Sequence, residues 1–346
     1  MSHNTITALE VVLPGRVEPH ELRVEQRELP PPAPGQAVVR VEATGVSFAE
    51  QQMRRGKYYD QPPFPFVPGY DLVGTVAAVG DAVDPRLVGR RVAALTKTGG
   101  WSTHVLLDAA DLVAVPEGLD AAAAETFVVN GITAWQMLHR VAKVTAGQTI
   151  LVHGANGGVG STLVQLARIA GVRVIGTASA RNAEKVAALG AIPVDYRDDV
   201  ARRVRDIAPD GVAAVFDHIG GPGIVDSFRL LAPGGTLVAY GTASTKDDDG
   251  NSRLPVLKLL ARLALWNMVP NKRNAHFYNI WQGSRNRTRF HNRLAEDLRA
   301  VFDLAANGEL HPQIAARIPL TEAGRALTLA ESRTVTGKVV LIPETL

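Results

Sequence analysis

The sequence has no cysteine among its 346 residues. Disulfides, a thiolate zinc site and a cysteine nucleophile are therefore excluded, and this composition is compatible with a reducing compartment. The segment from Met1 to Thr7 is polar, so we expect no secretory signal there. Together these features lead us to expect a cytoplasmic protein.

Long hydrophobic runs are also missing. The longest apolar tract, Leu254 to Val269, is interrupted by Lys258 and Arg262 and is shorter than a membrane span requires. The formal net charge is only +3, and the excess lies mainly in residues 271–293, which hold six Lys or Arg and no Asp or Glu. This tract favours a solvated or phosphate-facing loop, and we expect neither a nucleic-acid nor a membrane partner.

The length of the chain is comfortable for two domains. Before Ala121, short apolar stretches separated by Gly and Pro predict the strands of a small β-barrel. This part carries no nucleotide motif. A β-hairpin is predicted over residues 8–29, and further strands over residues 37–46, 73–80, 91–95 and 101–107.

From Ala121 onward, helical and strand patterns alternate, which predicts an α/β fold with a doubly wound parallel sheet. The acidic stretch 247–250 is predicted as a solvent-exposed turn. Predicted helices cover residues 121–127, 132–141, 183–188, 200–207, 224–231 and 293–306, and predicted strands cover residues 192–196, 211–217, 236–241 and 338–342.

The chain is organised around the stretch from Thr149 to Ser179, which predicts a strand, a glycine turn, a helix and a second strand. The turn, residues 155–160, reads ANGGVG and matches the dinucleotide fingerprint, with Ala155 at the first glycine position. Gly157 and Gly158 have no Cβ, so a pyrophosphate can approach the unpaired N–H groups of the first helical turn. The sequence therefore predicts a dinucleotide site.

A carboxylate is missing where an NAD site usually has one, about 20 residues beyond the turn. The tip of the second predicted strand reads TASAR over residues 177–181. Ser179 can donate a hydrogen bond, and Arg181 and Lys185 can pair with a phosphate. These residues predict NADPH rather than NADH as the cofactor.

Taken in order, the motifs resemble the medium-chain dehydrogenase/reductase superfamily, in its zinc-free quinone oxidoreductase branch. The resemblance covers essentially the whole chain, and the segment between Ser244 and Asn292 is similar to the vesicle amine transport protein subgroup. The motifs that carry it are residues 45–50 (GVSFAE), 67–71 (VPGYD), 130–134 (NGITA), the glycine turn, 233–235 (PGG) and 337–340 (GKVV).

This resemblance implies a GroES-like β-barrel catalytic domain over residues 1–126 and 285–346, and a Rossmann NADPH-binding domain over residues 127–284. It also implies a homodimer joined through sheet edges, with residues 275–280 as the pairing strand. Zinc-dependent relatives carry Cys and His where Ser47 and Phe48 stand, and His where Tyr70 stands. We therefore expect no metal and no alcohol oxidation.

The resemblance also implies which residues line the cofactor, with Tyr196 near the adenosine 2′-phosphate. Asp217 and His218 follow the carboxyl end of a predicted parallel strand, where ligands bind in such sheets. We favour His218 as a solvated neighbour of the cofactor over a proton donor, and single histidines such as His153 are interpreted as structural. The predicted cofactor-binding residues are Asn130, Thr133, Ala155, Asn156, Gly157, Gly158, Val159, Gly160, Ser179, Arg181, Lys185, Tyr196, Asp217, His218, Gly241 and Lys338.

Without zinc, the substrate must be an electron-poor acceptor held against the nicotinamide, which fits a quinone or an α,β-unsaturated carbonyl. Hydride addition at carbon moves negative charge to oxygen, and that oxygen needs a hydrogen-bond donor. Ser47, Tyr58 and Tyr59 are the candidate catalytic residues for this contact. Phe64, Trp101 and Tyr278 are the predicted walls of an apolar substrate pocket.

The sequence thus predicts an NADPH-dependent, zinc-independent reductase of quinones or α,β-unsaturated carbonyls. Two alternatives stay open. A pathway-specific enoyl-thioester reductase would act only on acyl-carrier or coenzyme A substrates. An NADPH-binding protein without turnover would bind RNA or a membrane surface through the basic tract, which contains Arg285, Arg287 and Arg289.

Overall fold

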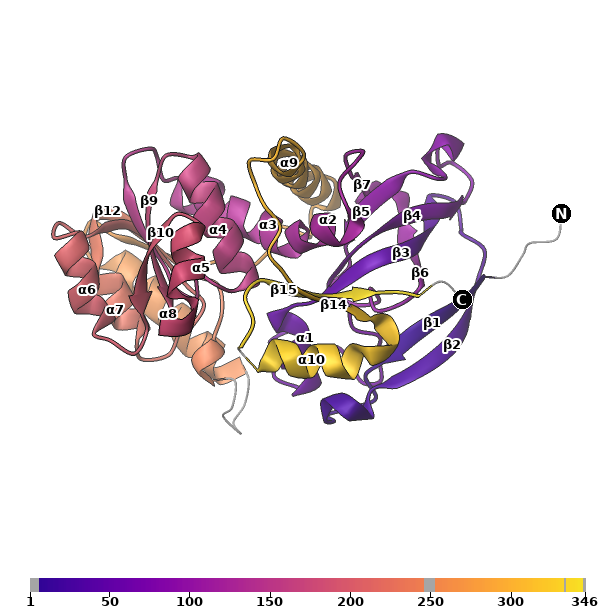
Figure 1. The fold of residues 1–346 in the computed structure, drawn as a ribbon, viewed down its shortest axis with the longest axis horizontal. Coiled ribbons are helices and arrows are strands. Elements are labelled where there is room, and N and C mark those ends of the chain that lie inside the picture. The colour runs from indigo at the N-terminus through magenta and orange to yellow at the C-terminus, as the bar shows by residue number, and fades with distance from the viewer. Residues whose placement is uncertain (1–5, 246–252, 333, 345–346) are drawn as a thin grey trace. The chain divides into compact units, whose positions relative to one another are not determined.

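The computed structural model describes residues 6–245, 253–332 and 334–344. The acidic turn predicted over residues 247–250 lies outside these ranges. The chain forms two compact units, Met1–Asn130 with Gly283–Leu346 (unit 1) and Gly131–Gln282 (unit 2). Figure 1 traces the indigo strands of unit 1, the magenta and orange elements of unit 2, and the yellow C-terminal strands that return to unit 1.

Unit 1 is built on a seven-stranded sheet around the long strand β3 (Gln36–Val46). β4 pairs with β3 in antiparallel fashion, while β6 pairs with the first part of β3 and β15 with its end. Two register shifts in the β3–β4 pair mark bulges, which bend the sheet. The other strands are β4 (Asp71–Val79), β5 (Arg91–Leu95), β6 (His104–Asp108), β7 (Val113–Ala114), β14 (Ile314–Pro319) and β15 (Lys338–Ile342).

The predicted hairpin is a separate two-stranded sheet of β1 (Ile6–Val12) and β2 (Arg23–Leu29), with Ile6 opposite Leu29. The sequence pattern does not predict the short helix α1, because three of its seven residues are polar and nevertheless buried. Helix α9 begins six residues earlier than predicted. The helices of this unit are α1 (Phe48–Arg54), α2 (Ala121–Phe127), α9 (Arg287–Ala306) and α10 (Ala323–Glu331).

Unit 2 contains a six-stranded parallel sheet in the order β10-β9-β8-β11-β12-β13. The chain starts at the centre with β8, runs outward to β10, and then crosses over to β11. This is the doubly wound order, with the switch point between β8 and β11, and it confirms the predicted fold class. The strands are β8 (Thr149–Val152), β9 (Arg173–Ala178), β10 (Ala191–Asp195), β11 (Val212–Asp217), β12 (Leu231–Ala239) and β13 (Asn274–Phe277).

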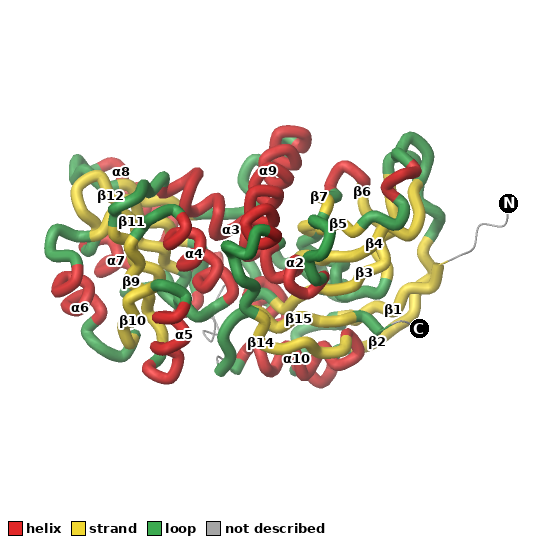
Figure 2. Tube along the Cα trace, turned by 45° about the horizontal axis from the view of Figure 1, so that its top comes forward, coloured by secondary structure: helices red, strands yellow, loops and turns green. Residues whose placement is uncertain are grey.

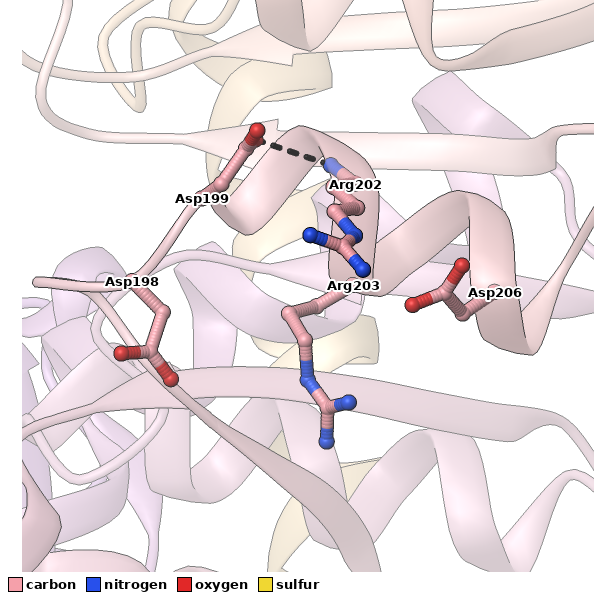
Figure 3. A pocket seen from close by; sticks show the side chains of 5 residues that line it. All are labelled: Asp198, Asp199, Arg202, Arg203 and Asp206. Carbon is pink, nitrogen blue, oxygen red and sulfur yellow. Dashed lines mark hydrogen bonds between the residues drawn. The ribbon is translucent and has the colours of Figure 1, made fainter.

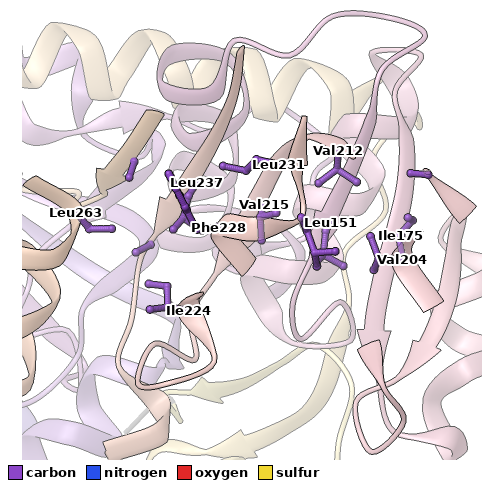
Figure 4. Packing of buried hydrophobic residues seen from close by; sticks show 14 of the residues in the cluster. Leu151, Ile175, Val204, Val212, Val215, Ile224, Phe228, Leu231, Leu237 and Leu263 are labelled. Carbon is purple, nitrogen blue, oxygen red and sulfur yellow. The ribbon is translucent and has the colours of Figure 1, made fainter. Parts of the chain in front are cut away.

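Helices flank the unit 2 sheet, as the red and yellow segments of Figure 2 show. Right-handed crossovers put α4 and α5 on one face and the helices that follow β10 on the other. On that second face, Val204 of α6, Phe228 of α7 and Leu263 of α8 share one buried cluster with strand residues such as Val215 and Leu237 (Figure 4). The helices are α3 (Val129–Trp135, at the unit boundary), the π-helix Gln136–Ala142, α4 (Gly158–Ile169), α5 (Ala183–Ala188), α6 (Val200–Ile207), α7 (Ile224–Arg229) and α8 (Arg253–Met268).

Helix α8 follows no amphipathic pattern because it is apolar on two sides. Leu259 and Leu263 are buried against the sheet, whereas Leu257 and Leu265 are exposed. None of the helices in the described part of the chain is long and apolar enough to cross a membrane. Short 3-10 helices lie at Pro19–Glu21, Pro85–Leu87, Ala109–Asp111, Ala180–Asn182, Ala243–Thr245 and Leu320–Glu322.

Candidate functional site

The glycine turn joins β8 to α4 at the carboxyl edge of the unit 2 sheet. Gly154 has a φ of +65°, a left-handed conformation that glycine adopts without strain. Ala155 donates its N–H to the carbonyl of Thr177 at 2.9 Å, which ties the turn to β9. Gly157 is the N-cap of α4, and as a glycine it has no side chain with which to cap this helix end. The first N–H groups of α4 are therefore available to an anion.

Two glycines of the turn differ in what the fold requires of them. A Cβ added to Gly160 would lie 2.2 Å from the carbonyl oxygen of Gly154, so close packing of α4 on the turn requires glycine. A Cβ added to Gly157 would meet that oxygen only at 3.4 Å, an ordinary contact. The fold therefore does not need glycine at position 157, whereas a pyrophosphate close to the backbone does. The turn fits the pyrophosphate of a dinucleotide.

The residues predicted for the 2′-phosphate lie together after β9. Ser179 is 7% exposed, and its Oγ accepts a hydrogen bond from Nδ2 of Asn182 at 3.2 Å. Arg181 and Lys185 are exposed on the turn and helix that follow. One buried hydroxyl and two exposed cations thus share this strand tip.

The sequence analysis did not assign a carboxylate that stands at the same tip. Asp195 ends β10, the strand next to β9, and its Oδ2 accepts the N–H of Ala180 at 3.0 Å. Its Oδ1 accepts the N–H of Arg197 at 2.9 Å. The tip of β9, which has no acidic residue of its own, is therefore braced by a carboxylate from the neighbouring strand.

Arg197 is a second residue that the sequence analysis missed. Its guanidinium carbon lies 5.6 Å from the ring centre of Tyr196, a cation–π contact, and Tyr196 is 54% exposed. In the sequence, the one signal for Arg197 is that it directly follows Tyr196, a predicted cofactor residue. The basic groups at this end of the sheet therefore include Arg197 as well as Arg181.

Asp217 and His218 follow β11 and make different contacts. The Oδ1 of Asp217 accepts the N–H groups of Ile219 at 2.8 Å and of Gly220 at 2.9 Å. The ring of His218 lies beside the glycine turn, because a Cβ added to Gly154 would stand 2.5 Å from its Cε1. His218 is therefore next to the turn, whereas the Asp217 carboxylate binds its own loop.

In unit 1, Ser47 and Glu50 form the capping box of α1. The Oγ of Ser47 accepts the N–H of Ala49 and donates to Oε2 of Glu50, which also accepts the N–H of Ser47 at 2.8 Å. Burial raises the pKa of Glu50, and the hydrogen bond from Ser47 lowers it by less. Ser47 can therefore donate to a substrate only by leaving Glu50.

Three tyrosines gather beside this cap. The hydroxyl oxygens of Tyr58 and Tyr70 lie 2.8 Å apart, and those of Tyr58 and Tyr59 lie 3.5 Å apart. The N–H of Tyr70 also donates to Oε1 of Glu50 at 2.7 Å, which connects the tyrosines to the capping box. Burial raises the pKa of Tyr58 far above its ordinary value, and the neighbouring tyrosines add to this. Tyr58 therefore stays protonated and able to donate at neutral pH.

Lys338 lies in the interior of unit 1. Its Nζ contacts Glu125 and both carboxylate oxygens of Asp71, at 3.0 and 2.7 Å. Burial lowers the pKa of Lys338, but the two carboxylates raise it by more. A Cβ added to Gly45 would lie 2.2 Å from Cε of Lys338, so the motif glycine makes room for this ion pair. A role for Lys338 at the cofactor stays a prediction.

The three predicted pocket walls lie in different surroundings. Phe64 packs on Phe66 with ring centres 5.6 Å apart. Trp101 is 1% exposed, and its Nε1 donates to the carbonyl of Gly45 at 2.9 Å, within the core of unit 1. Tyr278 belongs to unit 2. Their role as walls stays a prediction.

The remaining predicted cofactor residues lie at or near the ends of elements. Asn130 and Thr133 are buried on α3. Gly241 follows β12, and a Cβ there would stand 2.7 Å from the carbonyl oxygen of His218. Gly241 is therefore required by the packing of these two loops, and its contact with the cofactor stays a prediction.

A hollow of about 360 Å³ lies at the start of α6, and Figure 3 shows the five charged side chains that line it. Asp199 caps α6 by accepting the N–H of Arg202 at 2.9 Å. The described residues that line this hollow are all charged and offer no apolar side chain to a quinone ring, so we do not assign the substrate to the hollow. The lining residues are Asp198, Asp199, Arg202, Arg203 and Asp206.

Ser47, Phe48 and Tyr70 are the residues at which the resemblance described above implies the zinc ligands of zinc-dependent enzymes. Within residues 6–245, 253–332 and 334–344, no group of three or more His, Asp or Glu side chains could hold a metal ion.

Two family models match the chain, an alcohol dehydrogenase GroES-like domain over residues 33–117 and a zinc-binding dehydrogenase over residues 189–341. The synaptic vesicle membrane protein VAT-1 homolog of Rattus norvegicus is 32% identical over 339 residues, covering 93% of this chain and 81% of that protein. The phthioceranic/hydroxyphthioceranic acid synthase of Mycobacterium tuberculosis is 33% identical over 345 residues, covering 97% of this chain and 15% of the synthase.

Two solved structures are similar over nearly the whole chain. The quinone oxidoreductase of Pseudomonas syringae pv. Tomato DC3000 matches with a TM-score of 0.83 and 29% identity, covering 97% of this chain and 100% of that chain. A mycobacterial protein solved in complex with NADPH matches with a TM-score of 0.82 and 30% identity, with the same coverage.

A bent antiparallel sheet in one unit and a doubly wound nucleotide fold in the other define a class of nicotinamide-dependent oxidoreductases. The chain belongs to the medium-chain dehydrogenase/reductase superfamily, and solved quinone oxidoreductases are among the structures that it resembles. Within that superfamily it is similar to the VAT-1 homologues.

Proposed function

We propose that this protein is an NADPH-dependent, zinc-independent reductase that transfers hydride to quinones or α,β-unsaturated carbonyls. The observation that carries the proposal lies in the glycine turn. Residue 157 is a glycine, although the fold leaves room for a Cβ at this position. The similar quinone oxidoreductase and the similar protein solved with NADPH support the reaction class and the cofactor.

In this proposal the first N–H groups of α4 bind the pyrophosphate, and the tip of β9 selects the phosphorylated ribose. Ser179 and Arg181 contact the 2′-phosphate, and Lys185 adds positive charge. We add Arg197 to this group because it is stacked on Tyr196 at the end of the adjacent strand. Asp195 holds the two strand tips together through the N–H groups of Ala180 and Arg197.

NADPH, when bound, supplies the hydride. The chain's own contribution is made at the acceptor oxygen, where negative charge collects once hydride has added to carbon. Tyr58 is the donor we assign to that oxygen, since burial keeps its hydroxyl protonated. One proton taken from water, together with the hydride, completes the two-electron reduction, while Tyr58 keeps its own proton and donates a hydrogen bond. Tyr70 orients the Tyr58 hydroxyl.

The test is NADPH oxidation, followed by absorbance, with a panel of simple quinones and 2-alkenals. Oxidation that depends on both protein and acceptor is expected for at least one of the two classes. Inactivity with every quinone and every alkenal would overturn the proposal. The Tyr58→Phe variant tests the assigned donor in the same assay.

An enoyl-thioester reductase is the second candidate. It is favoured by the match to one segment of an acid synthase, in which 97% of this chain aligns with 15% of the synthase. The two candidates share the cofactor site and differ only in the acceptor. Activity with an enoyl coenzyme A or an enoyl acyl-carrier substrate, and none with quinones or alkenals, would decide for the second.

A homodimer and a cytoplasmic location belong to the same proposal. β13 is the last strand of the unit 2 sheet in the described part of the chain. Asn267 of α8 bonds both the N–H and the carbonyl of Ala275 on this strand, at 2.9 and 2.8 Å. A second copy that pairs strand to strand must therefore displace this amide. Light scattering should give twice the mass of one chain, and the mass of a single chain would refute the dimer.

A further inference from the structure

Four polar side chains from separate elements of unit 2 meet beneath the glycine turn. They are Thr177 on β9, His153 directly after β8, Ser227 on α7 and Asp217 at the end of β11. All four are buried, with exposures of 1, 9, 3 and 2% in that order. Burying four polar groups is favourable only when their hydrogen bonds are made, so their mutual contacts decide whether they stabilise the fold.

The contacts run from one side chain to the next. Ser227 Oγ donates to Oδ2 of Asp217 at 2.7 Å and lies 3.1 Å from Nε2 of His153. Because the serine proton goes to the carboxylate, Nε2 must be the donor toward Ser227. Nδ1 of His153 is then an acceptor, and it lies 3.3 Å from Oγ1 of Thr177.

A neutral imidazole is required for this arrangement. Burial lowers the pKa of His153, and the Asp217 carboxylate raises it by less. The ring therefore carries a single proton at neutral pH, on Nε2. The sequence analysis interpreted His153 as a structural residue, and its contacts specify which groups it connects.

Each end of this chain of contacts holds a loop at the carboxyl edge of the sheet. Thr177 Oγ1 accepts the N–H of Gly154 at 3.1 Å, at the beginning of the glycine turn. Asp217 accepts the N–H groups of Ile219 and Gly220 in the loop after β11. β8 and β11 are the strands on either side of the topological switch point, where doubly wound sheets bind their ligands.

We propose that Ser227 is a positioning residue for the cofactor, acting through His153 and Asp217 to hold the glycine turn and the loop after β11 at a fixed separation. Ser227 does not touch the ligand in this account. The inference rests on the proposed function, because it takes NADPH as the ligand of the turn.

A serine hydroxyl is the smallest group that can accept from His153 and donate to Asp217 at the same time. Alanine at this position would leave a buried N–H and one side of a buried carboxylate without partners. The imidazole and the carboxylate are then expected to reorient, and the two loops lose their common anchor. The binding energy of a ligand held by both loops should fall as well as the stability of the fold.

The test compares Ser227→Ala with Val204→Ala, which creates a cavity in the hydrophobic cluster of unit 2 and alters none of the four polar side chains. NADPH binding is measured by calorimetry, and the melting temperature of each variant is measured without ligand. Ser227→Ala should raise the Kd about tenfold, the loss expected for one buried hydrogen bond. Val204→Ala should lower the melting temperature with a Kd within about twofold of wild type.

Two further variants keep the test decisive if Ser227→Ala folds poorly. Ser227→Thr keeps the hydroxyl and should restore the Kd. Thr177→Val removes the contact with Gly154 at the other end of the chain and should weaken binding in the same way. Hydrogen exchange at the amides of Gly154 and Gly220 should become faster in both Ser227→Ala and Thr177→Val, and not in Val204→Ala.

The outcomes separate the two claims. If wild type binds NADPH, and Ser227→Ala and Thr177→Val bind it as tightly as Val204→Ala, the positioning role is wrong and the proposed function stands. If wild type does not bind NADPH, both the proposed function and this inference are overturned. Weaker binding with faster exchange at both glycines, restored by threonine, supports the inference.

Discussion

The hydroxyl oxygen of Tyr70 lies 2.8 Å from that of Tyr58, with the two rings edge to face at 6.3 Å between centres. Through this contact Tyr70 fixes the orientation of the neighbouring Tyr58 hydroxyl.

Removal of the Tyr58 hydroxyl should reduce turnover. We expect Tyr58→Phe to lower kcat about 100-fold with a smaller change in KM, since the lost donor acts mainly on the developing charge. Tyr70→Phe should lower kcat by less, about tenfold, because Tyr58 stays in place and only its orientation loosens. Steady-state kinetics with the best acceptor of the panel measures both. Full turnover by Tyr58→Phe would exclude it as the donor.

Alanine at the two glycines of the turn should affect different properties, NADPH binding at position 157 and stability at position 160. Gly157→Ala should keep the wild-type melting temperature and raise the Kd for NADPH at least about tenfold, because its Cβ is tolerated by the fold and lies where the pyrophosphate must approach. Gly160→Ala should lower the melting temperature, since its Cβ would stand 2.2 Å from the Gly154 carbonyl oxygen. Thermal melts and calorimetry measure both. Unchanged binding by Gly157→Ala would remove the pyrophosphate from this turn.

Cofactor choice should depend on Arg181 and Arg197. Each alanine variant should weaken NADPH binding about tenfold and leave NADH binding unchanged, because a charge-assisted bond to the 2′-phosphate is lost. Arg205→Ala, on the exposed side of α6, is the matched control for a lost surface cation. The ratio of the two dissociation constants is the measurement. An Arg197→Ala variant with the wild-type ratio would remove that residue from the phosphate site.

The contribution of Glu125 to stability should fall as pH rises above the ordinary pKa of glutamate. Burial raises the pKa of Glu125 well above its ordinary value of 4.5, and Lys338 lowers it by less. The folded state thus holds a proton that the unfolded chain releases. This contribution to stability is complete below the unfolded pKa and is lost as pH rises through the folded one.

Glu125→Gln removes that titration while keeping an acceptor for Lys338. Its melting temperature should therefore decline less than that of wild type between about pH 5 and about pH 8. Glu28→Gln, at an exposed position on β2, is the control and should follow the wild-type curve. Parallel curves for wild type and Glu125→Gln would show that Glu125 ionises normally.

Features confined to one short stretch of chain could be predicted from the sequence. The turn at 155–160, the cations after β9 and the alternation of strands and helices all depend on local spacing, and the parallel sheet followed from them. Helix α2 was predicted with its observed bounds for the same reason. Helix α8 was not predicted, because leucines on two of its sides obscure the helical period.

Contacts between distant residues were out of reach. Asp195 reaches Ala180 only because β10 and β9 are neighbours, and His153 meets Ser227 across a separation of 74 residues. No local pattern marks these pairs, since each residue alone is an ordinary polar residue. The sequence indicated the kind of ligand, and the arrangement of the strands brings together the side chains that we propose hold its site in shape.

The reaction itself is the most direct test of the proposed function. NADPH absorbance should fall when purified protein is mixed with NADPH and a simple quinone or 2-alkenal, and NADH should serve less well at the same concentration. No loss of NADPH with any quinone, alkenal or enoyl thioester, in a preparation that is folded by thermal melting, would contradict it.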